Sequence, residues 1–182
     1  MPGGVVALAC LPPAIAGALL RGPIERRLGT PATIAAALAA GGAAMAAAER
    51  RRGGRASEDA GTLDGLVLGG AQALALIPGV SRSGAVRAVA RMRGFGPREA
   101  QALSDAVGLP ITLAAVASSA RAAGGADRLT LALGASSAFA STLASSALLR
   151  RAGAARSLYP FAAYRIVLAA AVVRRLRENG PR

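Results

Sequence analysis

The most informative part of this chain is the stretch Gln72-Ala-Leu-Ala-Leu-Ile-Pro78-Gly79-Val80-Ser81-Arg82-Ser83-Gly84, which places one arginine and two hydroxyl groups in a hydrophobic sequence. Pro78 and Gly79 break a helix, and another glycine follows at Gly84. Such breaks expose backbone N–H groups, serines donate hydrogen bonds, and a guanidinium group binds oxyanions through two parallel bonds. The stretch therefore predicts a phosphate-binding turn. The alternative is a surface turn between two helices with a solvated Arg82.

The composition indicates a membrane protein. Hydrophobic residues make up 53% of the 182 residues, aromatic residues only 3%, and the mean hydropathy is +0.45. The formal net charge of +13 comes from 22 arginines, which gather in short loops between apolar segments, so we expect no nucleic-acid binding. One cysteine, Cys10, supports neither a disulfide nor a metal cluster. The sequence has no histidine, which excludes histidine acid–base chemistry and histidine metal sites.

The apolar segments predict an all-α, polytopic membrane protein that forms one integral membrane domain over residues 1–182. Residues 66–93 are expected to form a re-entrant helix hairpin, because the apolar run 66–80 is too short to cross the roughly 30 Å of a bilayer core. In its returning half, Arg87 and Arg91 lie four residues apart, and we interpret them as a stripe facing solvent or lipid headgroups. About five transmembrane helices are expected, near residues 4–20, 30–48, 100–120, 129–149 and 158–173.

The chain resembles the undecaprenyl-diphosphate phosphatases, also called bacitracin-resistance proteins. The residues that carry the resemblance are Gly69 to Gln72, Ile77 to Gly84, Arg98-Glu99-Ala100, Leu109-Pro110-Ile111 and Phe161 to Ile166. The resemblance implies two inverted repeats, each with a re-entrant helix pair, and hydrolysis of undecaprenyl diphosphate, which recycles the lipid carrier of cell-wall precursors. It implies a multi-pass protein of the bacterial inner membrane that acts on a polyprenyl diphosphate lipid, with a homodimer as a further possibility.

The same resemblance implies the site residues. Arg82 would hold the phosphate oxygens and stabilise charge at the transferred phosphorus. Ser81 and Ser83 would donate hydrogen bonds. An alternative role, in which one of the two serines acts as the nucleophile, stays open. The catalytic residues implied are Ser81, Arg82 and Ser83, and the substrate-binding residues are Gln72, Gly79 and Gly84.

The chain also departs from the family pattern. It corresponds to about the later two-thirds of a usual member, and the family's glutamate-rich first re-entrant segment and its histidine would lie upstream of Met1. A divalent cation is expected from the family, but its ligands are not found here, so the metal site is unknown. Asp105 stands where the family has an apolar residue. The alternatives are therefore a non-catalytic binder or transporter of polyprenyl phosphates, or an inactive truncated remnant.

Overall fold

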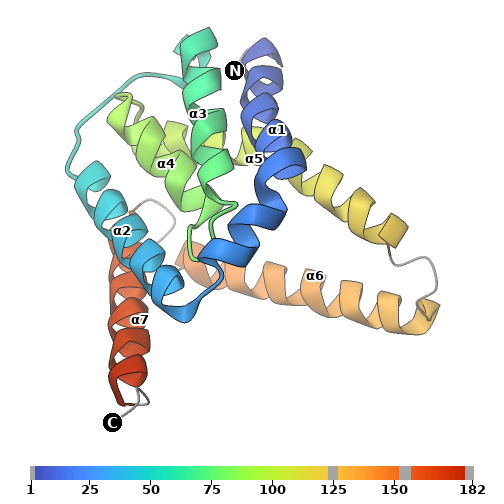
Figure 1. The fold of residues 1–182 in the computed structure, drawn as a ribbon. Coiled ribbons are helices and arrows are strands. Elements are labelled where there is room, and N and C mark those ends of the chain that lie inside the picture. Colours follow the sequence, from blue (N-terminus) through green and yellow to red (C-terminus); the bar gives the residue numbers. More distant parts are fainter. Residues whose placement is uncertain (1–2, 123–126, 152–156, 179–182) are drawn as a thin grey trace.

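The part of the protein that the structure describes is mainly α-helical. The computed structural model describes residues 3–122, 127–151 and 157–178, and these ranges contain no β-strand. The prediction of an all-α protein is therefore confirmed. The elements are α1 (Gly3–Leu28), α2 (Pro31–Glu49), the 3-10 helix η1 (Ser57–Asp59), α3 (Thr62–Leu74), α4 (Arg82–Met92), α5 (Pro97–Ala122), α6 (Arg128–Arg151) and α7 (Tyr159–Glu178) (Figure 1).

Four of the described helices are long and apolar enough to cross a membrane: α1, α2, α5 and α6. At about 1.5 Å per residue, the 20-residue span Leu129–Leu148 of α6 extends about 30 Å, which matches the thickness of a bilayer core. The fifth span expected near residues 158–173 is present as α7, but α7 is not among these four. It carries Arg165 and ends in a basic stretch with Arg174, Arg175 and Arg177.

Helices α3 and α4 form a short antiparallel hairpin. They have 13 and 11 residues, or about 20 Å and 17 Å, so neither alone reaches across a bilayer core. The Asp64 Oδ1 atom near the start of α3 lies 2.8 Å from the Arg93 Nε atom just after α4, so the open ends of the hairpin are side by side. This hairpin occupies the place predicted for residues 66–93. Its re-entry into a membrane remains a prediction.

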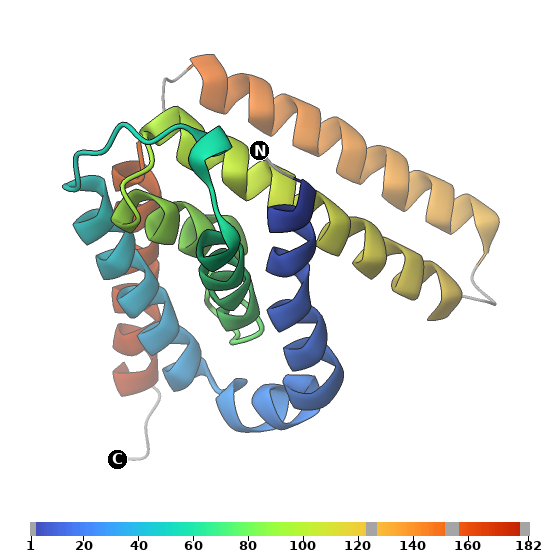
Figure 2. The same cartoon turned by 90° about the horizontal axis from the view of Figure 1, so that it is seen from above.

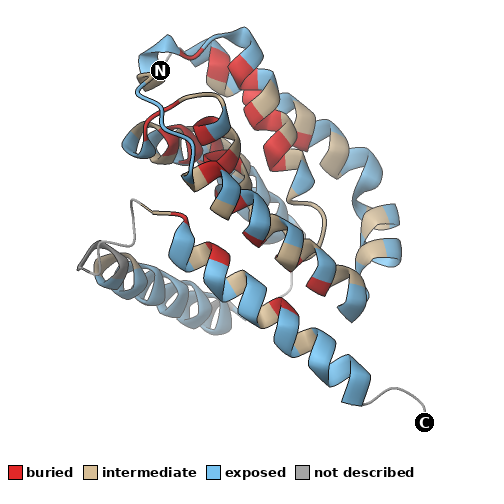
Figure 3. Cartoon of the chain, turned by 90° about the vertical axis from the view of Figure 1, so that its left-hand side faces the viewer, coloured by how far each residue is buried: buried red, intermediate tan, exposed pale blue. Residues whose placement is uncertain are grey.

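Helix α4 lies between two hydrophobic clusters. Its residues Val86 and Ala90 pack into a core that also includes Leu68, Phe95 and Leu103, from α3, the α4–α5 loop and α5. On its other side, Ala88 packs against a second cluster, whose other buried members are Met45, Ala48, Leu158 and Ala162. Helix α7 is exposed over most of its surface, whereas buried residues gather around the hairpin (Figure 3). Seen from above, α6 lies at the edge of the molecule (Figure 2).

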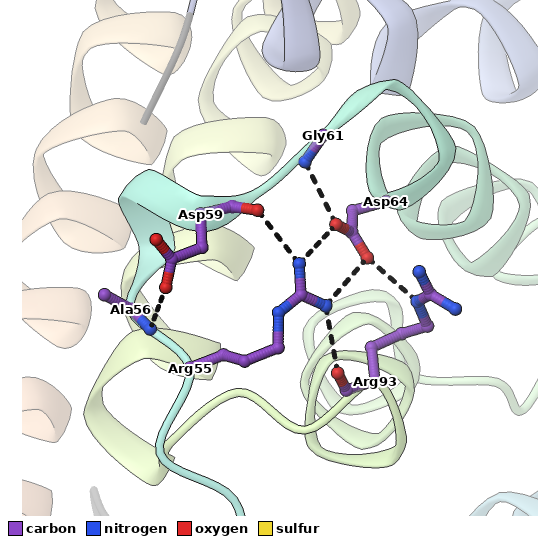
Figure 4. A network of polar contacts seen from close by, with 6 residues as sticks. All are labelled: Arg55, Ala56, Asp59, Gly61, Asp64 and Arg93. Carbon is purple, nitrogen blue, oxygen red and sulfur yellow. Dashed lines mark hydrogen bonds and ion pairs between the residues drawn. The ribbon is translucent and has the colours of Figure 1, made fainter.

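An ionic network closes the open end of the hairpin (Figure 4). Asp64 is buried and accepts hydrogen bonds from Arg55 (2.9 Å), Arg93 (2.8 Å) and the backbone N–H of Gly61 (3.0 Å). The Arg55 guanidinium carbon lies 4.2 Å from the centre of the Phe95 ring, a cation–π distance. Burial acts to raise the pKa of Asp64, but the hydrogen bonds from Arg55, Gly61 and Arg93 outweigh it and lower the pKa to about 2. The network therefore fixes the loop before α3 to both hairpin helices.

Candidate functional site

The closed end of the hairpin is a tight turn at Pro78-Gly79. After α3, two successive backbone N–H groups donate to the carbonyl oxygen three residues earlier: Leu76 donates to Ala73, and Ile77 donates to Leu74. Gly79 has φ +97, a conformation that residues with a side chain rarely adopt. A Cβ at this position would also lie 2.7 Å from the carbonyl oxygen of Ile34 on α2. The turn thus needs glycine both for its backbone angle and for its close approach to α2.

Helix α4 starts directly after this turn, and Ser81 is its N-cap. The Ser81 Oγ atom accepts a hydrogen bond of 3.3 Å from the N–H of Gly84, and the Ser81 carbonyl accepts one of 2.8 Å from Ala85. The first N–H groups of a helix have no partner within the helix and carry the positive end of its dipole. This end of α4 is therefore suited to bind an anion.

A cavity of about 330 Å³, which we call the arginine cavity, lies at this end of α4. It brings together two arginines from different helices, Arg87 of α4 and Arg165 of α7, with the hydroxyl groups of Ser81 and Ser83. Positive charge, hydroxyl donors and a helix N-terminus are the groups that bind phosphate. The full lining is Met45, Ser81, Ser83, Gly84, Arg87, Gln101, Leu158, Phe161, Tyr164 and Arg165.

Both arginines are held in place by neighbouring groups. The Nη1 atom of Arg165 donates a hydrogen bond of 2.6 Å to the carbonyl oxygen of Gly79, which joins α7 to the hairpin turn. The guanidinium carbon of Arg87 lies 5.8 Å from the centre of the Phe161 ring. A cation is stabilised at such a distance over an aromatic face. The cavity therefore presents two positioned positive charges.

The prediction that Arg87 and Arg91 form a stripe facing solvent or lipid headgroups is wrong, because both residues are only 7% exposed. Arg91 donates hydrogen bonds to the carbonyl oxygens of Arg51 (2.7 Å) and Phe95 (3.3 Å), so it holds two loops together. Arg87 lines the arginine cavity. Helical spacing placed both residues on one side of α4, but that side faces protein.

Arg82 points into a second, adjoining cavity of about 280 Å³, here called the Arg82 cavity. Its Nη1 atom donates hydrogen bonds to the carbonyl oxygen of Gly108 (3.0 Å) and to the Oγ1 atom of Thr112 (2.8 Å) on α5. Ser83 lines both cavities. The full lining is Arg82, Ser83, Ser104, Asp105, Gly108, Leu109 and Thr112. The three residues expected to be catalytic are thus distributed around two neighbouring cavities.

The residues expected to bind substrate are not all brought together. Gly84 lines the arginine cavity, and a Cβ there would collide with the Met45 Cε atom. Gly79 lies behind the cavity, where its carbonyl oxygen holds Arg165. Gln72 is 2% exposed and donates a hydrogen bond of 3.0 Å to the carbonyl oxygen of Ala9 on α1, so it lines neither cavity.

Sequence reasoning did not assign Tyr164 and Arg165 to the site. The signal was present, because Arg165 is a charged residue within an apolar segment, as Arg82 is. A charge in such a segment usually has a polar partner or a function. The sequence alone could not show that Arg165 contacts Gly79, because the two residues lie 86 positions apart in the chain.

The two cavities do not fit the divalent cation that the resemblance implies. Hard cations take oxygen ligands, chiefly carboxylates. The linings contain one carboxylate, Asp105, beside the three arginines Arg82, Arg87 and Arg165. Among the residues that the structure describes, no group of three or more histidine, cysteine, aspartate or glutamate side chains is placed to hold a metal ion. We therefore derive no chemical step through a metal.

Comparison with known proteins gives a consistent result. A family model described as bacitracin resistance protein BacA matches residues 3–171. The undecaprenyl-diphosphatase of Anaeromyxobacter sp. (strain K) is 38% identical over 113 residues, which cover 62% of this chain and 38% of that protein. The undecaprenyl-diphosphatases of Gemmatimonas aurantiaca and Geobacter metallireducens are 36% and 34% identical, over 88% and 90% of this chain and 61% and 64% of theirs. The chain spans less than two thirds of the length of these curated relatives.

Proposed function

Because the chain belongs to the bacitracin resistance protein BacA family, we propose that it is an enzyme that hydrolyses undecaprenyl diphosphate to undecaprenyl phosphate and inorganic phosphate. The relatives reported above carry the name undecaprenyl-diphosphatase. The fold agrees with a lipid substrate, since the chain is an all-α, multi-pass membrane protein. We place it in the bacterial inner membrane, where such a substrate would be met, and the homodimer stays a prediction.

One observation supports this proposal most directly. The N-terminus of α4, with Ser81 and Ser83, opens into the same cavity as Arg87 and Arg165. Hydrogen bonds between a guanidinium group and phosphate oxygens are short and strong because both partners are charged. In a cavity partly shielded from water, such groups stabilise the negative charge of a phosphoryl group. The arginine cavity therefore suits one phosphoryl group of a diphosphate.

The second cavity suits the other half of a diphosphate. A diphosphate has two phosphoryl groups joined by one bridging oxygen, and the two cavities share one residue, Ser83. We assign the terminal phosphoryl group to Arg82, whose cavity also contains the carboxylate of Asp105, and the phosphoryl group that bears the lipid to Arg87 and Arg165. The hydroxyl of Ser83 would then lie next to the bridging oxygen. This assignment retains Ser81, Arg82 and Ser83 as the residues that act on the reacting group.

The reaction adds water across the bond between the terminal phosphorus and the bridging oxygen. A water oxygen bonds to the terminal phosphorus while the bridging P–O bond breaks, and the lipid leaves as its monophosphate. The attacking water must lose a proton. Asp105 carries the one carboxylate in the linings of the two cavities, and its Oδ1 atom accepts a hydrogen bond of 2.7 Å from Gln101 Nε2. We assign the role of proton acceptor to Asp105.

The test is an assay of the chain reconstituted in lipid nanodiscs, with phosphate release and binding of undecaprenyl diphosphate measured separately. Arg87→Met should weaken binding about tenfold or more, because it removes a charge-assisted contact. The exposed Arg27 at the end of α1 supplies the control variant Arg27→Met, which should bind normally. Asp105→Asn should bind normally and release phosphate at least about a hundredfold more slowly.

Two results would contradict the proposal in different ways. If the wild-type chain binds the lipid but releases no phosphate, it is a binder of polyprenyl phosphates rather than a phosphatase. If Arg87→Met and Arg27→Met bind equally well, the arginine cavity is not the phosphate site.

A further inference from the structure

An apolar groove runs between α2 and the α3–α4 hairpin, and nothing described above uses it. Its volume is about 330 Å³. One wall is formed by α2, with mostly small residues, and the other by apolar residues of the hairpin. Ser81 is the one polar residue in its lining. The lining is Ala37, Ala40, Gly41, Ala44, Met45, Leu74, Ile77, Val80, Ser81, Ala85, Ala88, Val89 and Met92. We call this feature the α2 groove.

The α2 groove adjoins the arginine cavity. Met45 and Ser81 line both, so the same two side chains separate an apolar space from a positively charged one. Gly84 lines the arginine cavity and Ala85 the groove, which places successive residues of α4 on the two sides of this border.

The groove is also open along its rims. Leu74 is 54% exposed and Met92 is 60% exposed, and Ala40 and Ala44 are exposed as well. In a membrane protein, apolar residues exposed in this way face lipid chains. A long apolar chain can therefore lie in the groove and leave it along the rim without passing through a packed core.

We propose that the α2 groove binds the isoprenoid units of the substrate that lie next to its diphosphate. The inference rests on the proposed function. In a polyprenyl diphosphate the charged head and the apolar chain are joined by a covalent bond, so their binding sites must adjoin, as the arginine cavity and the groove do. Burial of each methylene group contributes about 0.8 kcal/mol, so the groove adds affinity that the head alone lacks.

The small residues of α2 keep the groove open. A Cβ built on Gly41 meets no atom within 4 Å, because it would enter the empty groove. A leucine at this position has room for its Cβ, and its longer side chain would occupy part of the groove. A Cβ on Gly134 of α6 likewise meets no atom within 4 Å, but Gly134 is not in the lining of the groove. These two glycines form a matched pair for an experiment.

The experiment compares two ligands with the wild-type chain, Gly41→Leu and Gly134→Leu in nanodiscs. Undecaprenyl diphosphate reports on head and chain together, and inorganic pyrophosphate reports on the head alone. Gly41→Leu should weaken the binding of undecaprenyl diphosphate about tenfold or more and leave pyrophosphate binding unchanged within about twofold. Gly134→Leu should bind both ligands as the wild type does. Ala44→Leu, on the exposed rim, repeats the test if Gly41→Leu fails to fold.

The outcomes separate this inference from the proposed function. If Gly41→Leu and Ala44→Leu bind undecaprenyl diphosphate as tightly as Gly134→Leu, the groove does not hold the isoprenoid chain. This result would leave the proposed phosphate site untouched. If they lose both ligands equally, the groove affects the head site and the inference is again wrong. If the wild-type chain does not bind pyrophosphate at all, the proposed phosphate site fails first, and the inference fails with it.

Discussion

Arg165 of α7 donates a hydrogen bond of 2.6 Å to the carbonyl oxygen of Gly79, 86 residues earlier in the chain. This bond links the last described helix to the turn that positions Ser81. It also holds the guanidinium group of Arg165 at the wall of the arginine cavity. One contact therefore stabilises the hairpin turn and places a charge at the candidate site.

Replacement of Arg165 by methionine should lower both stability and anion binding. A hydrogen bond from a charged group contributes about 1.5 to 3 kcal/mol, and the Gly79 carbonyl would lose this partner. We expect a lower melting temperature in detergent together with about tenfold weaker pyrophosphate binding. Arg174→Met on the same helix, which removes an exposed pair with Glu178, should change little. Equal binding by the two variants would remove Arg165 from the site.

Gly79→Ala should destabilise the protein by about 2 kcal/mol, because φ at Gly79 is +97 and an alanine Cβ would lie 2.7 Å from the Ile34 carbonyl oxygen. Gly70→Ala provides the control, since a Cβ there meets no atom within 4 Å and alanine is favoured over glycine in a helix. Thermal unfolding followed by circular dichroism measures both. A melting temperature for Gly79→Ala no lower than that of Gly70→Ala would show that the turn tolerates a side chain.

The hairpin turn could be predicted from the sequence because its causes are local. Proline restricts its own backbone angle, glycine permits a positive φ, and the apolar runs on either side are too short to cross a membrane. All of these features lie within residues 66–93, so no contact with a distant part of the chain is needed to predict the turn. The turn at Gly79 lies where the sequence predicted a break.

The direction of the arginine side chains could not be predicted in the same way. Helical spacing places Arg87 and Arg91 on one side of α4, but only the packing of other elements decides whether that side faces water or protein. Arg82 turns towards Gly108 and Thr112 of α5, 26 and 30 residues later. A single sequence contains no signal for such pairs.

Asp64→Asn should cost about 3 kcal/mol of stability. The substitution removes a buried carboxylate that pairs with Arg55 and Arg93, and it leaves two guanidinium groups without their counter-charge. Glu25→Gln is a matched control, because Glu25 pairs with Arg21 on the exposed surface of α1, where an ion pair contributes little. Denaturation in mild detergent would compare the two. Similar stability of both variants would mean that the network of Figure 4 is not needed to hold the hairpin.

The same carboxylate predicts how stability depends on pH. The pKa of Asp64 is lowered from 3.8 to about 2 in the folded protein, so the folded state binds a proton less readily than the unfolded chain. Its contribution of about 2 kcal/mol should be complete above about pH 4 and be lost as the pH falls towards 2. Asp64→Asn should lack this part of the decline. A carboxylate titrates between about pH 5 and pH 2. If the stability curves of wild type and Asp64→Asn run parallel over this range, the pH dependence does not come from Asp64.

The assignment of two phosphoryl groups to two cavities predicts a difference between two simple anions. Orthophosphate needs one phosphoryl site and should bind in the arginine cavity, whereas pyrophosphate should also reach Arg82 across Ser83. Arg82→Met should therefore weaken pyrophosphate binding about tenfold and leave orthophosphate binding nearly unchanged. Arg87→Met should weaken both. Calorimetric titration of each variant with each anion measures the four affinities, and an equal loss of both anions in Arg82→Met would mean that the two cavities act as one undivided site.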